Sequence, residues 1–303
     1  MKWRRTKSRD VIDVRGARGG GGGSGGGMAL PGGMGRIGGG AGLIVVLVVV
    51  GLQLLGGGGG SGFDIGQVLS PGVQAPGASN PQPIPPSEDP QRDLKDFSVY
   101  VFEDTQDFWR TALSSEGTGY EGAELVLYSG AVSTEGCGGA TSAVGPFYCP
   151  PDGRVYLDLS FYEDMRRQLG ASGDFAWAYV IAHEMGHHVQ RELGTSDEVH
   201  REEQTDPEEA NELSVRLELQ ADCYAGFWGS SVFEAGDLEK GDLQEAFTAS
   251  EAVGDDRLQK QGGGSVDPDS FTHGTSEQRR RWFTRGYKSA EAGACDTFTA
   301  DAL

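Results

Sequence analysis

Residues 183–187 read His-Glu-Met-Gly-His, and this pattern constrains the fold of the chain more than any other stretch. It follows an apolar run over 175–182 that is typical of a buried helix. On a helix, positions i and i+4 lie one turn apart on one face, so both imidazoles can bind the same Zn²⁺. Glu184, beside the first histidine, can then reach a water on that metal. The pattern predicts metal-activated water attacking a carbonyl group, with Glu184 as general base.

A surface helix with two unrelated histidines is the alternative interpretation of this pattern. The chain has only five histidines, and three of them stand at 183, 187 and 188. Such clustering argues against chance placement. On a helix, His188 points about 100° away from His187, so we expect it to be a polar neighbour and not a ligand.

A catalytic zinc site has three protein ligands and one open position, so a third ligand must come from elsewhere. The stretch Glu218-Leu-Gln-Ala-Asp222 places two acids one helical turn apart among apolar residues, where an unpaired charge is costly. We expect Glu218 to be the third ligand and Asp222 to accept a hydrogen bond from a ligating histidine. A solvated acidic face is the competing interpretation. Glu192, Asp197 and Glu202 lie too close along the chain, or in an expected loop.

The first 88 residues differ in composition from the rest. Residues 1–36 carry eight Lys and Arg against two Asp and are rich in glycine, which predicts a disordered cytoplasmic tail. Residues 37–55 contain no charge, and their length approaches the roughly 20 residues that cross a bilayer. They predict one transmembrane helix, with a cleaved signal peptide as the alternative. Residues 56–88 read as a Gly/Pro-rich linker.

The charge distribution predicts an orientation for this segment. Its basic flank is N-terminal, so we expect a single-pass protein of the cell membrane with a cytoplasmic N-terminus and an extracytoplasmic domain. Residues 37–303 hold 17 basic and 43 acidic residues. This acidic part is expected to bind neither nucleic acid nor an anionic lipid surface. The sequence carries no signal for an oligomeric state.

Residues 89–303 predict one folded domain of the α+β class, mostly helical with a small sheet. Helices are expected at 89–113, 161–169, 174–193, 208–229, 238–253 and 276–288. Strands are expected at 124–128 and 154–158, and an acidic loop at 195–207.

Four cysteines in an exported domain predict disulfide bonds. Cys137, Cys149, Cys223 and Cys295 allow three pairings. We favour Cys137–Cys149, which closes a short Gly-rich loop, and this leaves Cys223–Cys295. No C-x-x-C pair exists, so a cysteine zinc site is not expected.

The motifs together resemble a known family. H-E-x-x-H followed some thirty residues later by E-x-x-x-D is similar to the gluzincin metallopeptidases, including the membrane-anchored HtpX-like proteases. More closely, the chain resembles bacterial neutral zinc metallopeptidases of the YpfJ type. The matching segments are Cys149-Pro150, Val155–Asp158, Tyr179–Gln190, Arg216–Gly226 and Thr272–Arg279. The resemblance implies a zincin-like peptidase domain, Zn²⁺ as cofactor, and a protein or peptide as substrate.

The same resemblance suggests two further catalytic residues. HtpX-like proteases carry a histidine–proline pair with an arginine six residues after the histidine. His273 and Arg279 stand at that spacing here, with glycine in place of proline. Either would stabilise the oxyanion that forms on the attacked carbonyl. The alternative is that His273 caps the final helix and Arg279 pairs with a surface acid. Residues 155–158 are expected to be the edge strand to which a peptide substrate adds.

The sequence therefore predicts a membrane-anchored zinc endopeptidase with His183, His187 and Glu218 on the metal. A zinc-stabilised binding or scaffold domain without catalysis is the second hypothesis. The presence of Glu184 argues against it, because a structural zinc site has no use for a general base. An amidase acting on cell-wall peptides is a third, and the sequence does not discriminate its substrate.

Overall fold

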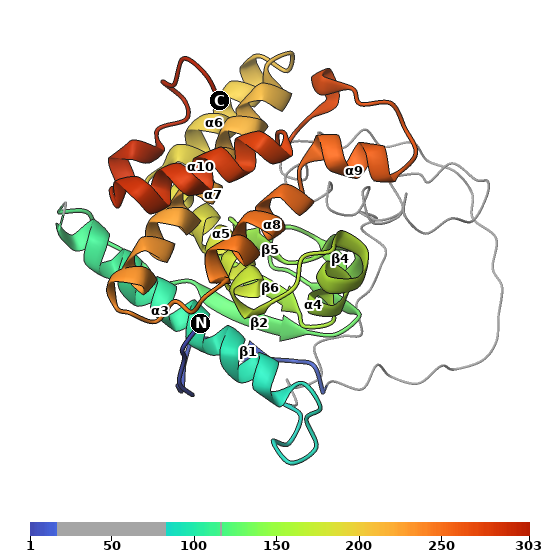
Figure 1. Ribbon diagram of the computed structural model, residues 1–303, viewed down its shortest axis with the longest axis vertical. Coiled ribbons are helices and arrows are strands. Elements are labelled where there is room, and N and C mark those ends of the chain that lie inside the picture. Colours follow the sequence, from blue (N-terminus) through green and yellow to red (C-terminus); the bar gives the residue numbers. More distant parts are fainter. Residues whose placement is uncertain (17–82, 116) are drawn as a thin grey trace.

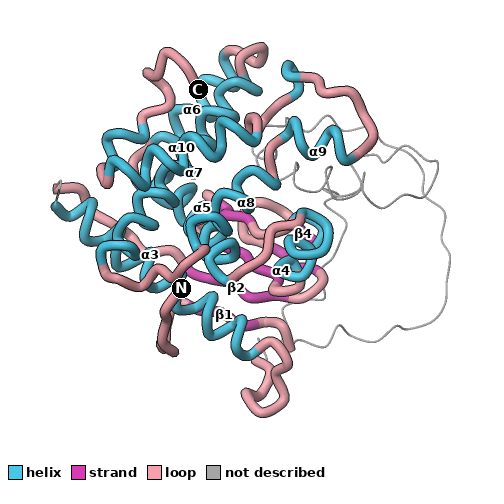
Figure 2. The backbone as a smooth tube through the Cα atoms, in the orientation of Figure 1, coloured by secondary structure: helices cyan, strands magenta, loops and turns pink. Residues whose placement is uncertain are grey.

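The computed structural model describes residues 1–16, 83–115 and 117–303 and confirms a mostly helical α+β domain with a small sheet (Figure 1). The strands are β1 (Val11–Asp13), β2 (Glu124–Tyr128), β3 (Ala131–Ser133), β4 (Gly139–Thr141), β5 (Phe147–Cys149) and β6 (Arg154–Asp158). The longer helices are α3 (Arg92–Ser115), α5 (Asp174–Glu192), α6 (Thr195–Thr205), α7 (Ala210–Glu234), α8 (Asp242–Ala252), α9 (Asp255–Gln261) and α10 (Ser276–Ser289). The short helix α4 (Phe161–Asp164) precedes α5. Figure 2 shows the strands lying among these helices.

Four strands form the main sheet in the order β1-β2-β6-β5. The first three run parallel, and β5 runs antiparallel to β6. Strand alternation sends Leu125 and Leu127 into the core beneath the helices, and Val126 and Tyr128 to the opposite face. The β3–β4 hairpin covers that second face. Because β2 and β5 flank β6, the prediction that residues 155–158 form an edge strand is wrong.

Helix α5 occupies the centre of the helical layer. It packs against α3, α7, α8 and the strands β5 and β6. Nearly all of its residues from Phe175 to Gln190 are buried, and the Trp177 indole donates a 2.8 Å hydrogen bond to Ser98 Oγ on α3. The helix ends before Gly194, whose φ of 80° is a left-handed conformation that glycine adopts without strain. The motif at 183–187 therefore lies on a rigid, buried support.

One expected loop is a helix. Residues 195–207 were expected to be an acidic loop, and 195–205 form α6. Only Val199 of this helix is buried, so its sequence lacks the apolar periodicity by which helices are recognised. Packing between α5 and α7, and not a periodic pattern, accounts for its helical conformation.

Residues 1–16 pack on the folded domain, so the disordered tail expected over 1–36 does not include them, and residues 17–36 lie outside the described residues. Strand β1 pairs in parallel with β2, and Val11 lies opposite Leu125. The Trp3 ring packs edge-on against a phenylalanine of α3 at 5.5 Å between centroids. Composition averaged over 36 residues hides these apolar positions, which find partners only in the folded domain.

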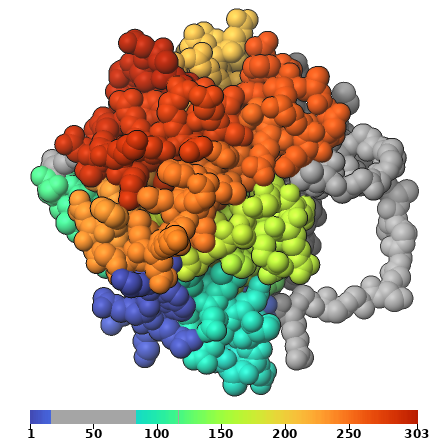
Figure 3. All heavy atoms as spheres, viewed as in Figure 1, coloured from blue at the N-terminus to red at the C-terminus, as the bar shows by residue number. Residues whose placement is uncertain are grey.

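Ion pairs fasten the same N-terminal segment. The Arg15 guanidinium lies 2.7 Å from an Asp89 carboxylate oxygen, and both side chains are fully buried. The α-amino group of Met1 lies 2.8 Å from the Asp174 carboxylate at the start of α5. Figure 3 shows these N-terminal residues, in blue, lying against α8 and the start of α3. Some of the basic residues on which the prediction of a solvated tail rests therefore form ion pairs with acidic residues of the domain.

The prediction of a single-pass membrane protein is also corrected. In the described parts of the chain, no helix is long and apolar enough to cross a membrane. The expected transmembrane segment 37–55 lies outside the described residues. The predicted topology places residues 1–36 and the domain on opposite sides of a bilayer, but residues 1–16 pack on that domain. The cytoplasmic N-terminus with an extracytoplasmic domain is therefore wrong.

Two glycines allow α7 and α10 to cross in close contact. A Cβ atom at Gly286 of α10 would overlap the carbonyl oxygen of Cys223, and one at Gly226 of α7 would overlap that of Phe283. Each overlap involves backbone, which a rotamer change cannot relieve. This crossing sets the distance between the helices that carry Asp222 and Arg279.

We predict that Gly286→Ala destabilises the domain by about 1–3 kcal/mol, because the helices must separate to admit the methyl group. Urea unfolding of the full chain measures this. Gly229→Ala on α7 is the matched control, since its Cβ would meet only side-chain atoms at 3.7 Å or more. The control should be neutral or slightly stabilising through its higher helix propensity. Equal losses in the two variants would contradict the role of the crossing.

Candidate metal centre and active site

The motif residues lie in the second half of α5, facing α7. The exposed fractions of His183, Glu184 and His187 are 7%, 8% and 8%. The two imidazole centroids are 4.8 Å apart, as expected for residues one turn apart on a helix. Helices α5 and α7 approach closely at Gly186, where an added Cβ would lie 3.0 Å from the Cα of Ala221. The glycine within the motif thus brings α7 next to the histidines.

Glu218 of α7 completes the cluster. One of its carboxylate oxygens lies 3.1 Å from His183 Nε2, and the other lies 3.4 Å from His187 Nε2. His183, His187 and Glu218 each place one possible ligand atom within 4.8 Å of those of the other two. Two imidazole nitrogens and a carboxylate are a donor set that zinc binds in catalytic sites. The structure therefore brings together the three residues that the sequence predicted as ligands.

The outer nitrogen of each imidazole is held by a hydrogen-bond acceptor. His183 Nδ1 lies 2.9 Å from an Asp222 oxygen, and His187 Nδ1 lies 2.9 Å from Gln190 Oε1. The Gln190 amide donates in turn to the Leu217 carbonyl at 2.7 Å, which fixes its orientation. Because both acceptors are oxygens without a proton, Nδ1 carries the hydrogen in each neutral ring, and the Nε2 atoms, which face Glu218, have the lone pairs that would bind a metal. The tautomers therefore fit the binding of Zn²⁺.

Electrostatics of the cluster favour positive charge at its centre. Burial lowers the pKa of His183, but the carboxylates of Asp222 and Glu218 outweigh burial and raise the pKa to about 10. Burial raises the pKa of Glu218, yet the nearby imidazoles hold it well below its usual range. A divalent cation would satisfy the same excess of negative charge.

Asp222 connects the cluster to α10. The Arg279 guanidinium donates to both Asp222 oxygens, at 2.8 Å from Nε and 3.0 Å from Nη2. The Tyr179 hydroxyl, one turn before His183, donates to the same carboxylate at 2.5 Å. All four side chains are buried. Asp222 thus holds His183 while Arg279 and Tyr179 neutralise and orient Asp222.

The alternative interpretation, in which Arg279 pairs with an acid on the surface, is wrong. It is 2% exposed, and its partner is a buried acid beside the metal cluster. Its Nη2 lies 3.8 Å from the Glu218 carboxylate, and the side chain reaches the wall of the pocket. The geometry shows a residue that positions Asp222, and its role toward an oxyanion stays a prediction.

His273 lies in the same pocket and is held by an acid that sequence reasoning missed. Its Nδ1 is 3.2 Å from an Asp255 oxygen. The other Asp255 oxygen accepts backbone N–H groups of residues 272–274 at 2.7–3.1 Å. These bonds fix the loop that follows α9 and the direction of the imidazole. His273 does not cap α10, because Thr275 and Gln278 form that helix's capping box.

Glu184 lies beside the cluster, in the wall of an apolar pocket. No hydrogen bond to its carboxylate occurs among the described residues, and burial raises its pKa. Apolar side chains form most of the remaining wall: Val144, Pro146, Phe147, Phe161, Val180 and Val253. A carboxyl group with a raised pKa, free of other partners, is suited to accept and return a proton.

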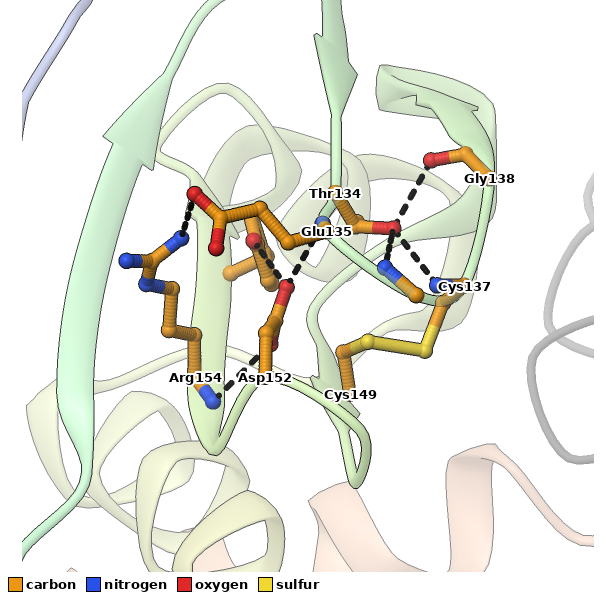
Figure 4. The surroundings of a disulfide bond; sticks show 9 residues. Thr134, Glu135, Cys137, Gly138, Cys149, Asp152 and Arg154 are labelled. Carbon is orange, nitrogen blue, oxygen red and sulfur yellow. Dashed lines mark hydrogen bonds and ion pairs between the residues drawn. A yellow bond between two sulfur atoms is a disulfide. The ribbon is translucent and has the colours of Figure 1, made fainter.

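Both expected disulfides are present. Cys223–Cys295 joins α7 to the C-terminal segment, and Cys137–Cys149 joins the loop after β3 to the end of β5. Figure 4 shows the second bond beside Asp152, whose carboxylate accepts the backbone N–H of Glu135 at 3.0 Å. These contacts hold the segment between β4 and β5 in place. Val144 and Pro146 of this segment line the pocket that contains the metal cluster.

Sequence reasoning missed several supporting residues of the site. Tyr179 and Gln190 stand at helical spacing from the two histidines, four residues before and three after, so that spacing was an available signal. Asp255 is 18 residues from His273 along the chain. No local pattern links these two, and only the fold brings them together.

The chain is similar to known proteins over most of its length. A model of the family described as "Putative neutral zinc metallopeptidase" matches residues 1–298. The chain is 46% identical over 300 residues to YpfJ of Escherichia coli K12, which covers 98% of this chain and 99% of that protein. It is 45% identical over 193 residues to Rv2575 of Mycobacterium tuberculosis H37Rv, which covers 60% of this chain and 64% of the relative. Both relatives bear the description "Uncharacterized protein". No solved structure matches the chain.

We predict that Asp222→Asn lowers the affinity for Zn²⁺ by about 10–100-fold, because the amide binds the His183 ring less well and leaves Arg279 without its counter-charge. Competition with a chromophoric chelator measures this in the folded protein. Asp255→Asn is the matched control, since its partner His273 is not a ligand, and its zinc affinity should be unchanged. Equal affinities of the Asp222 variant and the unaltered chain would contradict the supporting role of Asp222.

Proposed function

Since the chain belongs to the family of neutral zinc metallopeptidases, we propose that it is a zinc-dependent peptidase with Zn²⁺ held by His183, His187 and Glu218. The convergence of two Nε2 atoms and a carboxylate, with Glu184 alongside, carries this proposal. We further propose that the site is of the gluzincin type, because its third ligand is a glutamate on a second helix. The substrate would be a protein or peptide.

The residues of this site would divide the reaction among them. Bound Zn²⁺ would supply Lewis acidity, which activates water and polarises the carbonyl group. Glu184 would accept the proton from the attacking water and deliver it to the leaving amine. His273, with Nδ1–H donated to Asp255, would present Nε2–H to the oxyanion when the ring is protonated. Asp222 and Gln190 would keep both ligand imidazoles in the orientation described above.

The edge strand β5 is the proposed docking strand for the substrate backbone. It replaces residues 155–158, which lie inside the sheet. Phe147 and Tyr148 of β5 line the pocket that contains Glu184. A peptide that adds to β5 would be bound through main-chain hydrogen bonds, which are tolerant of sequence. Among the lining residues, the charged groups all belong to the metal cluster or lie beside it.

A zinc-stabilised binding domain without catalysis is the alternative function. It would be favoured by a fourth protein ligand that closes the coordination sphere. Among the described residues, the cluster contains three. Glu184 is also buried without a hydrogen-bond partner among the described residues. Such a group lowers the stability of the fold and is typical of a functional site. Both observations support the catalytic proposal.

We predict that Glu184→Gln abolishes peptide cleavage by at least about 100-fold while zinc content is retained, because the amide cannot accept the proton. Metal analysis and a peptide-digestion assay on the same preparation measure the two effects. His183→Ala is the comparison variant, and it should lose zinc as well as activity. Retained zinc with unchanged cleavage in the Glu184 variant would exclude its role as general base.

We also predict that cleavage favours an apolar residue next to the scissile bond, since the pocket beside Glu184 is walled by apolar side chains. In an unbiased peptide library, such sites should be cut about tenfold or more faster than those with a charged residue, because burying an unpaired charge is costly. Val180→Asp should reduce this preference, and Val180→Thr, similar in shape, should reduce it less. Equal cleavage of apolar and charged sites would contradict the assignment of the pocket.

A further inference from the structure

His188 follows the second ligand histidine directly, and the site described above leaves it without a function. Its side chain is almost completely buried, with 1% exposed. Both ring nitrogens have partners: Nδ1 lies 3.0 Å from the Tyr148 hydroxyl, and Nε2 lies 2.7 Å from the Glu121 carbonyl oxygen. As the sequence predicted, the ring points away from the metal cluster. It bridges two segments that are distant in sequence.

The hydrogen bonds define which atom donates at each end. A carbonyl oxygen only accepts, so Nε2 of His188 carries the hydrogen that is given to Glu121. In the neutral ring, Nδ1 then accepts the hydrogen of the Tyr148 hydroxyl. Tyr120 and Tyr148 pack edge-on against the imidazole, at 5.3 Å and 5.5 Å between centroids. The ring is thus fixed by two directional bonds and two aromatic contacts.

The bridge connects the two elements that the proposed reaction must align. Tyr148 is the middle residue of the edge strand β5, where it lies opposite Val155 of β6. His188 stands four residues after Glu184, so the two side chains project from the same side of α5, one turn apart. The bond between His188 and Tyr148 therefore spans from the helix that carries Glu184 to the strand that lines its pocket.

We propose that His188 and Tyr148 are positioning residues that hold strand β5 in register with helix α5, so that a peptide paired with β5 presents its carbonyl group to Glu184. This inference rests on the proposed peptidase function. Neither residue contacts the three ligands through a hydrogen bond. Without these two side chains β5 would be less ordered, so part of the binding energy of the peptide would be used to order it, while metal binding should stay in place.

Three variants of the full chain test the proposal. His188→Phe keeps the ring volume and removes both hydrogen bonds, Tyr148→Phe removes only the hydroxyl, and His188→Gln keeps one donor and one acceptor. For a peptide substrate of the zinc-loaded protein, His188→Phe and Tyr148→Phe should raise KM about five- to twentyfold, the size expected for a lost buried hydrogen bond. The value of kcat should change less than about threefold, and His188→Gln should restore most of the KM.

A double variant and a matched control isolate the contact. With both substitutions present, KM should be no higher than for His188→Phe alone, because the two side chains act through one bond. Tyr128→Phe is the control, since its hydroxyl donates to the Thr141 carbonyl at 3.4 Å on the opposite face of the sheet. That control should leave KM unchanged.

Hydrogen exchange gives a readout that is independent of cleavage. Backbone amides of β5, residues 147–149, should exchange faster in His188→Phe and Tyr148→Phe than in the unaltered chain, while zinc content stays the same. Unchanged KM and unchanged exchange, or a loss of zinc that accounts for the lost activity, would overturn the positioning role. An unaltered, zinc-loaded chain that cleaves no peptide would instead count against the proposed function, and the exchange data would still decide whether the bridge holds β5.

Discussion

The buried carboxylate of Asp222 is the constraint on which the site depends. A charge with no exposure to solvent is tolerated only when it is paired, and Asp222 is fully buried. Its partners come from two other helices, His183 on α5 and Arg279 on α10. Satisfying one charge on α7 thus fixes three helices relative to one another. Glu218 lies one turn before Asp222, so the same arrangement brings its carboxylate to the imidazoles of His183 and His187.

Close packing of α5, α7 and α10 allows Asp222 to pair with His183 and Arg279. Gly186 lets α5 approach α7, and Gly226 and Gly286 let α7 approach α10. Residues without side chains at these crossings are therefore as necessary as the charged residues they bring together. The imidazoles of His183 and His187 are held through their Nδ1 atoms, and the next residue, His188, connects the same helix to β5 through its hydrogen bond to Tyr148. Helix α5 thus carries the proposed catalytic residue Glu184, the two histidines of the motif and the contact to the proposed substrate strand β5.

Much of the site was predictable because its parts lie on two strongly patterned helices. The spacing of His183 and His187 indicates a shared face, and acids at 218 and 222 among apolar residues indicate burial with partners. Helix α5 was placed within one residue for the same reason. The strand β1 and helix α6 were missed, because a three-residue strand and a helix with one buried residue carry no periodic signal. The expected membrane topology failed because composition does not reveal that residues 1–16 pack on the domain.

The sequence by itself determined the donor atoms of the site, since residue type and helical spacing decide which side chains can share a metal. It also indicated the disulfide pairing through the short loop between Cys137 and Cys149. Only the tertiary structure decided which residues hold those side chains in place and which strand lies at the edge of the sheet. Arg279 and Asp255 gain their roles from contacts across 57 and 18 residues of chain, and β5, not β6, is the edge of the sheet. Contacts between distant segments depend on how the elements pack in three dimensions, and local spacing carries no record of that packing.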